Sequence, residues 1–205
     1  MALISNGTTV FDNGSMASGF GGSMVLIKKL TASSSGSLNF VHGTAGVVLD
    51  STYKEYLFTF NNLHASAAET WLQFQTSTNS GSNYNISCTS TNFLAHHNEG
   101  DGNTGINYYD AKDHANDTGY IYLAAWEQGN DADQSTSGML KFYNPSNTTF
   151  QKHWLCTLSI SHPGDFCTDG HASGYFNTTS AINAITFKFV SGNIDSGDIC
   201  LYGIA

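Results

Sequence analysis

Short runs in which apolar and polar residues alternate, separated by turn residues, dominate this sequence. In KEYLFTFNNL (54–63), Tyr56, Phe58 and Phe60 occupy every second position. Such period-two alternation predicts a strand with one buried face. No segment keeps a 3.6-residue period over three turns, so we expect no substantial helix. About ten such runs in one chain predict an all-β fold.

The expected strands share β-branched or aromatic residues and are bounded by Gly, Asn, Asp or Ser. They span 24–31, 36–42, 46–49, 54–63, 70–77, 84–95, 119–126, 137–144, 153–161, 184–191 and 198–205. We therefore predict a single antiparallel two-sheet β-sandwich, jelly-roll-like, over residues 24–205. Residues 1–23 are rich in Gly, Ser and Asn and predict an extended N-terminal arm.

Charge and composition exclude several classes of partner. The chain has a net charge of −9, and all seven basic residues are lysines. Without arginine's planar fork, recognition of nucleic acid is not expected, and neither is docking on an acidic membrane. No run of about 18 apolar residues exists, so we expect no membrane insertion.

The cysteines are expected to be reduced. The N-terminus MALISNGTTVFDNGSM has no basic region followed by an apolar one, so we do not expect a signal peptide. Four cysteines without a CxxC pair then read as free thiols, mostly buried in strands. They are Cys88, Cys156, Cys167 and Cys200, with a Cys156–Cys167 disulfide as the alternative.

Residues 97–119 concentrate carboxylates and histidines, and we expect them to form a solvated surface loop. A calcium loop of the EF-hand type starting at Asp101 would place Lys112 at the twelfth position, where a carboxylate is needed. An irregular Ca²⁺ site built from Glu99, Asp101 and Asp110 stays open as an alternative.

Zinc and catalytic chemistry are not expected. The neighbours His96 and His97 point to opposite faces of a strand and cannot jointly hold one zinc ion. Cys167 lies between His162 and His171, so a Cys–His nucleophile is conceivable, but a passive thiol is the preferred interpretation. There is no G-x-S-x-G elbow, and no carboxylate pair stands out. We therefore assign no catalytic, cofactor or metal residue.

The aromatic residues raise one further possibility. Trp71, Trp126 and Trp154 are expected mainly in the core, because aromatic side chains dominate sandwich interiors. Trp71 shares a predicted strand face with Gln73 and Gln75 and is expected to be partly exposed. The candidate surface recognition residues are Trp71, His97, Asp101, Tyr108, Asp110 and Asp113.

Three segments give the chain a family resemblance. They are YKEYLFTFNNLH (53–64), LKFYNPSNTTFQKHW (140–154) and SGNIDSGDICLYGIA (191–205). With the order of the segments between them, they resemble a group of virion structural proteins from marine tailed phages, over about residues 24–205. The resemblance implies a non-enzymatic, usually oligomeric particle component and transfers no functional residue.

Three functions are therefore carried forward. The first is a virion protein on the particle exterior, either a tail-associated host-contact module or a capsid decoration protein, assembled in the host cytoplasm. Its partners would be itself, by analogy as a homotrimer, other virion proteins, and possible host surface glycans. We lean to the tail, with residues 97–119 and 162–175 as contact loops. The alternatives are a free carbohydrate-binding module and, behind it, a polysaccharide hydrolase.

Overall fold

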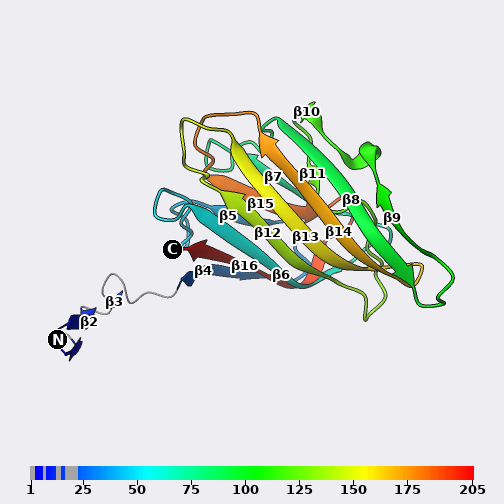
Figure 1. The fold of residues 1–205 in the computed structure, drawn as a ribbon, viewed down its shortest axis with the longest axis horizontal. Coiled ribbons are helices and arrows are strands. Elements are labelled where there is room, and N and C mark those ends of the chain that lie inside the picture. Colours follow the sequence, from blue (N-terminus) through cyan, green and yellow to red (C-terminus); the bar gives the residue numbers. More distant parts are fainter. Residues whose placement is uncertain (1–2, 7, 13–14, 17–22) are drawn as a thin grey trace.

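The computed structural model describes residues 3–6, 8–12, 15–16 and 23–205. Within them, two antiparallel sheets pack together, which confirms the predicted all-β sandwich (Figure 1). The large sheet contains β4 (Met24–Thr31), β6 (Glu55–Ala65), β8 (Cys88–Asn98), β9 (Thr104–Tyr108), β10 (Ala115–Asp117), β12 (Thr136–Tyr143), β13 (Lys152–His162), β14 (Phe166–Phe176) and β16 (Ile194–Ile204). The small sheet contains β5 (Leu38–Val41), β7 (Leu72–Ser77), β11 (Ile121–Tyr122) and β15 (Ala184–Phe189).

The chain crosses repeatedly between the two sheets, as expected for a jelly-roll-like sandwich. The large sheet has the order β10-β8-β14-β13-β12-β6-β16-β4, with β9 pairing beside β10 on β8, and the small sheet has the order β11-β7-β15-β5. Only β12, β13 and β14 follow one another as a meander. Strands distant in sequence are therefore neighbours, and the large sheet is much wider than the small one.

The core lies between the sheets and is aromatic. Tyr56, Phe58 and Phe60 of β6 are buried, as their alternation predicts. Phe187 of β15 meets them from the other sheet, with its ring centroid 5.2 Å from that of Phe58 and 5.3 Å from that of Phe60. Trp154 is also fully buried, which confirms its predicted core position.

The outward face of β7 is covered, contrary to the expectation from its alternation. All six residues of β7 are buried. Gln75 Nε2 donates hydrogen bonds to the carbonyls of Ile86 (3.2 Å), Thr118 (3.1 Å) and Gly119 (2.6 Å). The expected exposed face of Gln73 and Gln75 is therefore packed beneath the connection that leads to β11.

Several expected strand boundaries are wrong. Residues 46–49 are not a strand, because Val47 and Leu49 enter the core from a loop. Only Ile121–Tyr122 is strand within 119–126. β14 was expected as loop, since TDGHASG carries little apolar alternation, yet it pairs along its whole length with β13 and β8.

The predicted position of the cysteines, mostly buried in strands, is confirmed. All four cysteines are free and lie in strands, and Cys88, Cys156 and Cys200 are buried whereas Cys167 is exposed. In the β13–β14 register Cys156 lies opposite Ala172, so the alternative disulfide with Cys167 is not formed.

The expected N-terminal arm is described only in part. Its described residues form three short strands, β1 (Leu3–Ser5), β2 (Thr8–Asp12) and β3 (Ser15–Met16), which pair with one another and with neither larger sheet. Residues 1–2, 7, 13–14 and 17–22 of the expected arm lie outside the described residues.

Candidate functional site

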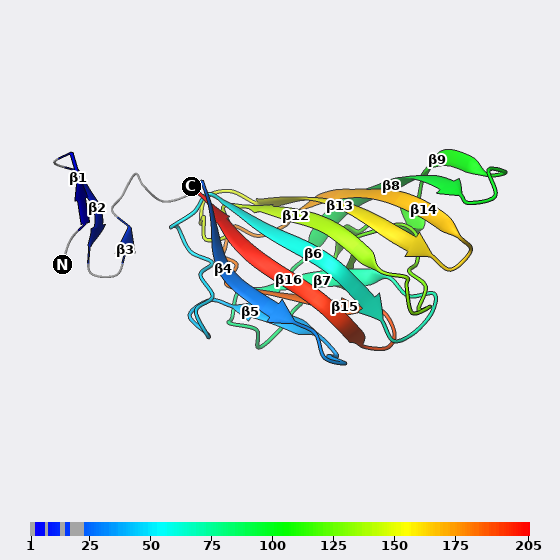
Figure 2. The ribbon, with the colours of Figure 1, turned by 90° about the horizontal axis from the view of Figure 1, so that it is seen from below.

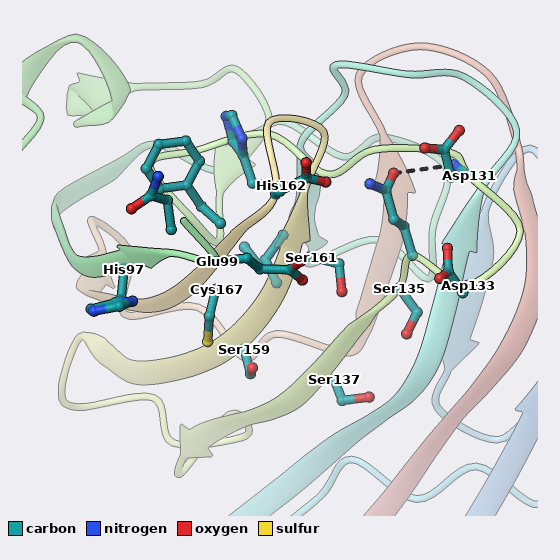
Figure 3. A pocket seen from close by; sticks show the side chains of 15 residues that line it. His97, Glu99, Asp131, Asp133, Ser135, Ser137, Ser159, Ser161, His162 and Cys167 are labelled. Atoms are coloured by element: carbon teal, nitrogen blue, oxygen red, sulfur yellow. Dashed lines mark hydrogen bonds between the residues drawn. The ribbon is translucent and has the colours of Figure 1, made fainter. Parts of the chain in front are cut away.

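A polar hollow lies at one end of the large sheet. It has a volume of about 560 Å³ and is lined by β8, β12, β13 and β14 and by the turns beyond them (Figure 3). We call it the polar hollow and define it by His97, Glu99, Asp133, Ser159, His162 and Cys167, which represent these elements.

Strand register explains why small polar side chains form its floor. Ser137 of β12 lies opposite Ser159 of β13, and Ser161 of β13 lies opposite Cys167 of β14. Cys167 in turn lies opposite His97 of β8. Because side chains alternate along a strand, these residues point to the same face. Their short side chains leave space that longer ones would fill.

The rim of the polar hollow is acidic. Glu99, Asp131, Asp133 and Asp165 contribute carboxylates, and no lysine is among the described lining residues. A second hollow of about 590 Å³ shares Asp133 with the first and extends the acidic surface. Such a surface suits neutral hydroxylated or cationic groups and disfavours anions.

Histidines pair with carboxylates around this end. His97 Nε2 lies 3.2 Å from Asp101 Oδ1, and His162 Nε2 lies 3.4 Å from Glu127 Oε1. His162 also packs against Trp126, with ring centroids 4.9 Å apart. Trp126 is half-buried, and its Nε1 donates a hydrogen bond to the Tyr109 hydroxyl. It therefore helps to hold His162 in place at this end of the sheet.

Metal binding is not supported in the described part of the chain. There, no group of three or more His, Cys, Asp or Glu side chains is arranged to hold a metal ion. Asp101 contacts His97, and Asp110 begins the short 3₁₀ turn η1 (Asp110–Lys112), so they serve different local structures. The calcium alternative therefore finds no clustered ligand set.

Cys167 is not paired with the histidines that flank it in sequence. His162 binds Glu127, and His171 Nε2 lies 3.1 Å from Asp169 Oδ2. The neighbour of Cys167 across the strands is instead His97. By contrast, burial raises the pKa of Cys88 to about 12, which keeps that thiol protonated and unreactive.

One contact has the composition of a catalytic triad. Thr157 Oγ1 lies 3.4 Å from His171 Nδ1, and the other nitrogen of the His171 ring meets Asp169. The three residues lie on the open face of central strands, whose backbone amides are engaged in the ladder and cannot serve as an oxyanion hole. We interpret the contact as structural.

The structure does not bring the six predicted recognition residues together. His97 and Asp101 pair at the β8–β9 turn, whereas Tyr108 donates a hydrogen bond to Asp113 further along the edge. That hydrogen bond to Asp113 is the main cause that raises the pKa of Tyr108. Asp110 is exposed in η1 beside this pair, and Trp71 lies directly before β7 of the small sheet.

The segment 97–119 is mostly exposed, as predicted, but His114 is buried, and the segment is not a loop throughout. It includes β9, η1 and β10, and both strands pair with β8 at the edge of the large sheet. The expectation of a loop was wrong because Gly, Asn and Asp in GNTGINYYD suggest turns, whereas edge pairing tolerates them. Residues 162–175 are likewise mostly β14, with a turn only around Asp165.

Trp71 is half-exposed, as expected, but its ring is occupied. The Lys112 ammonium lies 3.8 Å from the centroid of the Trp71 ring and 4.4 Å from that of Tyr122. Trp71 Nε1 donates to the carbonyl of Ala125 at 3.1 Å. Trp71 therefore links the connection before β12 to the small sheet, and the Lys112 ammonium occupies a face of its ring that a sugar would need for stacking.

The most extended surface feature is the face of the large sheet that points away from the small sheet. We call it the outer face. Its strand register lines up Met139 of β12, Thr157 of β13, His171 of β14, Phe93 of β8 and Tyr108 of β9. The Phe93 and His171 rings stack with centroids 5.1 Å apart. Unlike the face toward the core, this one has no covering layer among the described residues.

Large apolar side chains gather on the outer face. Ten such side chains are exposed in the described part of the chain, and seven of them lie on this face. These seven, with their exposed fractions, are Met24 (51%), Leu26 (55%), Phe93 (44%), Ile106 (78%), Tyr108 (63%), Met139 (44%) and Leu155 (49%).

Sequence reasoning missed most of the outer face. The alternation in β13 places Leu155 opposite the buried face of that strand, which is a signal that could have been read. The row of side chains from Met139 to Phe93 could not be predicted from the sequence, because it depends on the register of strands that are far apart in the chain.

The comparisons with known proteins give no match. No family model, no curated protein and no solved structure matches this chain. No helix in the described part of the chain is long and apolar enough to cross a membrane.

Proposed function

We propose that this chain is a non-enzymatic structural protein on the exterior of a phage particle, assembled there through its outer face. The observation that carries the proposal is the gathering of exposed apolar side chains on that face. A monomeric soluble protein rarely exposes a large contiguous apolar patch, so such a patch indicates a surface that another protein covers. The resemblance to marine phage virion proteins supports the same assignment.

The two ends of the sandwich differ in a way that fits a displayed protein. Ile204 of β16 pairs with Met24 of β4 and with Glu55 of β6, so the C-terminus and the start of β4 share one end. The polar hollow is lined by residues at the start of the β8–β9 turn, and Figures 1 and 2 show this turn at the end of the sandwich away from the C-terminus. We propose that the first end faces the particle and the second faces the host.

This orientation favours a tail-associated module over head decoration. The turns at Glu99, Asp131–Ser135 and Asp165 meet around the polar hollow, and surface turns tolerate sequence change while the sheets hold them in place. Their hydroxyl, carboxylate and imidazole groups can hydrogen-bond sugars, so host surface glycans are the proposed contact.

Immunogold electron microscopy tests the proposal. An antibody raised against this chain would be applied to purified phage particles whose proteins include its peptides. Gold on tails or fibres is the expected result, and gold on heads would assign decoration instead. Two results would reject a virion role. In the first, particles that contain the peptides in stoichiometric amount bind no gold even after mild disruption of the particle. In the second, the peptides separate from the particles on a density gradient.

The second candidate is a carbohydrate-binding module, and the polar hollow is the observation that favours it. It predicts glycan-array binding by the purified chain that is lost in Asp133→Ala and His162→Ala. Asp117→Ala is the matched control, since Asp117 lies in β10, outside the hollow. Binding that survives both hollow variants would remove this candidate, and release of reducing sugar from the same glycans would favour a hydrolase instead.

A further inference from the structure

We infer that the outer face is the contact between two copies of this chain, packed face to face about a two-fold axis. The inference rests on the proposed assembly role and names the partner: a second copy of the same chain. It differs from the homotrimer expected by analogy, and three properties of the face support it.

The first property is charge. The whole chain carries a net charge of −9, so two copies repel each other through most of their surfaces. Among the described residues of the outer face, the strands carry two lysines and three carboxylates, and Asp113 adds a carboxylate beside Tyr108 at the edge. Lys141 Nζ lies 3.1 Å from Glu55 Oε1, and Lys29 Nζ lies 3.3 Å from Asp198 Oδ2.

The other two carboxylates accept hydrogen bonds without a lysine partner, Asp169 beside His171 and Asp113 from Tyr108. By comparison, four carboxylates and no lysine line the polar hollow in the described part of the chain. A copy that approaches through the apolar part of the outer face therefore meets less repulsion than one that approaches the hollow, so charge favours this face for contact between copies.

The second property is that most of the exposed large apolar side chains lie on one face. Apart from the seven side chains on the outer face, the exposed large apolar side chains in the described part of the chain are Ile4, Phe150 and Val190, which lie apart from it. A ring such as a trimer needs two different complementary patches on each copy. A single patch can instead meet its own copy across a two-fold axis.

The third property is size. Eight neighbouring strands, from β4 at one edge to β9 at the other, present a surface roughly 38 Å wide, and the part of it outside the polar hollow is roughly 23 Å long, from standard strand spacing and rise. This amounts to about 800 Å² on each copy, which is the area that a stable protein interface needs. Two sheet faces can pack at about 10 Å separation, as they do within sandwiches.

Size-exclusion chromatography with light scattering on the purified chain is the test. The wild type is expected at twice the monomer mass of 22.0 kDa. Leu155→Glu and Phe93→Glu are expected to raise the dissociation constant of the dimer at least about tenfold, since each places two carboxylates in one interface. Phe150→Glu is the matched control, because Phe150 is 70% exposed in the connection between β12 and β13.

Salt gives an independent readout. Raising the ionic strength screens repulsion between acidic copies while leaving apolar contact in place, so the dimer should tighten with salt. Circular dichroism checks that each variant is folded. Wild type that stays monomeric at about 100 µM, a trimer, or a dimer that the two face variants leave intact would each overturn the inference. A monomer would still leave gold labelling of particles free to support a virion role.

Discussion

Exchanging Gln75 for glutamate tests whether the connection that leads to β11 covers the small sheet. The Gln75 amide is fully buried, and its nitrogen donates to three backbone carbonyls while its oxygen accepts from Thr76 N. Gln75→Glu keeps the shape but replaces the donor with an acceptor that faces those carbonyls. Each lost bond costs about 1 kcal/mol, and the buried carboxylate adds to this, so we expect a loss of about 4 kcal/mol at pH 7.

The pH dependence makes the prediction specific. Burial among carbonyls raises the pKa of the introduced carboxyl above its unfolded value of about 4.3. The folded variant then binds more protons than the unfolded one above that pH, so its stability falls as pH rises. The slope is at most about 1.4 kcal/mol per pH unit, and it ends at the folded pKa.

Urea unfolding of wild type and variant at several pH values from about 5.5 to about 8 measures both effects. Gln151→Glu is the control, because that exposed amide bonds only to the Asn177 side chain in the described structure, and its loss should stay within about 0.5 kcal/mol. A loss below about 1 kcal/mol for Gln75→Glu, without pH dependence, would refute the covering of β7.

Three further predictions concern single sites. Gly138→Ala should cost at least about 2 kcal/mol in urea unfolding, because a Cβ there would lie 2.2 Å from the Thr157 carbonyl oxygen; an unchanged midpoint would contradict the β12–β13 packing. Burial lowers the pKa of Lys152, so as the pH rises toward the unfolded pKa of about 10.4 the wild type should gain stability relative to Lys152→Met; a parallel pair of curves would contradict this. A thiol reagent should modify Cys167 alone in the native chain and all four cysteines in urea, as counted by mass spectrometry; rapid native modification of Cys156 would contradict its burial.

The sequence predicted the fold class because alternation survives wherever one strand face is buried. β4 matches its expected range at both ends, and β6 matches it closely. The sequence-based prediction of strands failed where both faces of a strand are buried, and where a polar segment pairs at the edge of a sheet. β7 alternates in sequence yet is buried on both faces, and β14 pairs fully with little apolar alternation.

The candidate site was less predictable than the fold. The expected recognition residues are local in sequence, but the polar hollow joins Ser137, Ser159, Cys167 and His97 across four strands. Only the register places them together, and register depends on packing rather than on local sequence pattern. The same reason hides the outer face, whose apolar side chains come one or two from each strand.

Hydroxyl-radical footprinting tests the central claim most directly, by comparing the free chain with the same chain in purified phage particles. Met139, Leu155, Phe93 and Tyr108 are exposed on the outer face and should be oxidised in dilute monomeric chain. In the particle we predict strong protection of these four, while Phe150, away from the face, stays reactive. Equal oxidation of the four side chains in both states would contradict the account that this protein assembles through its outer face.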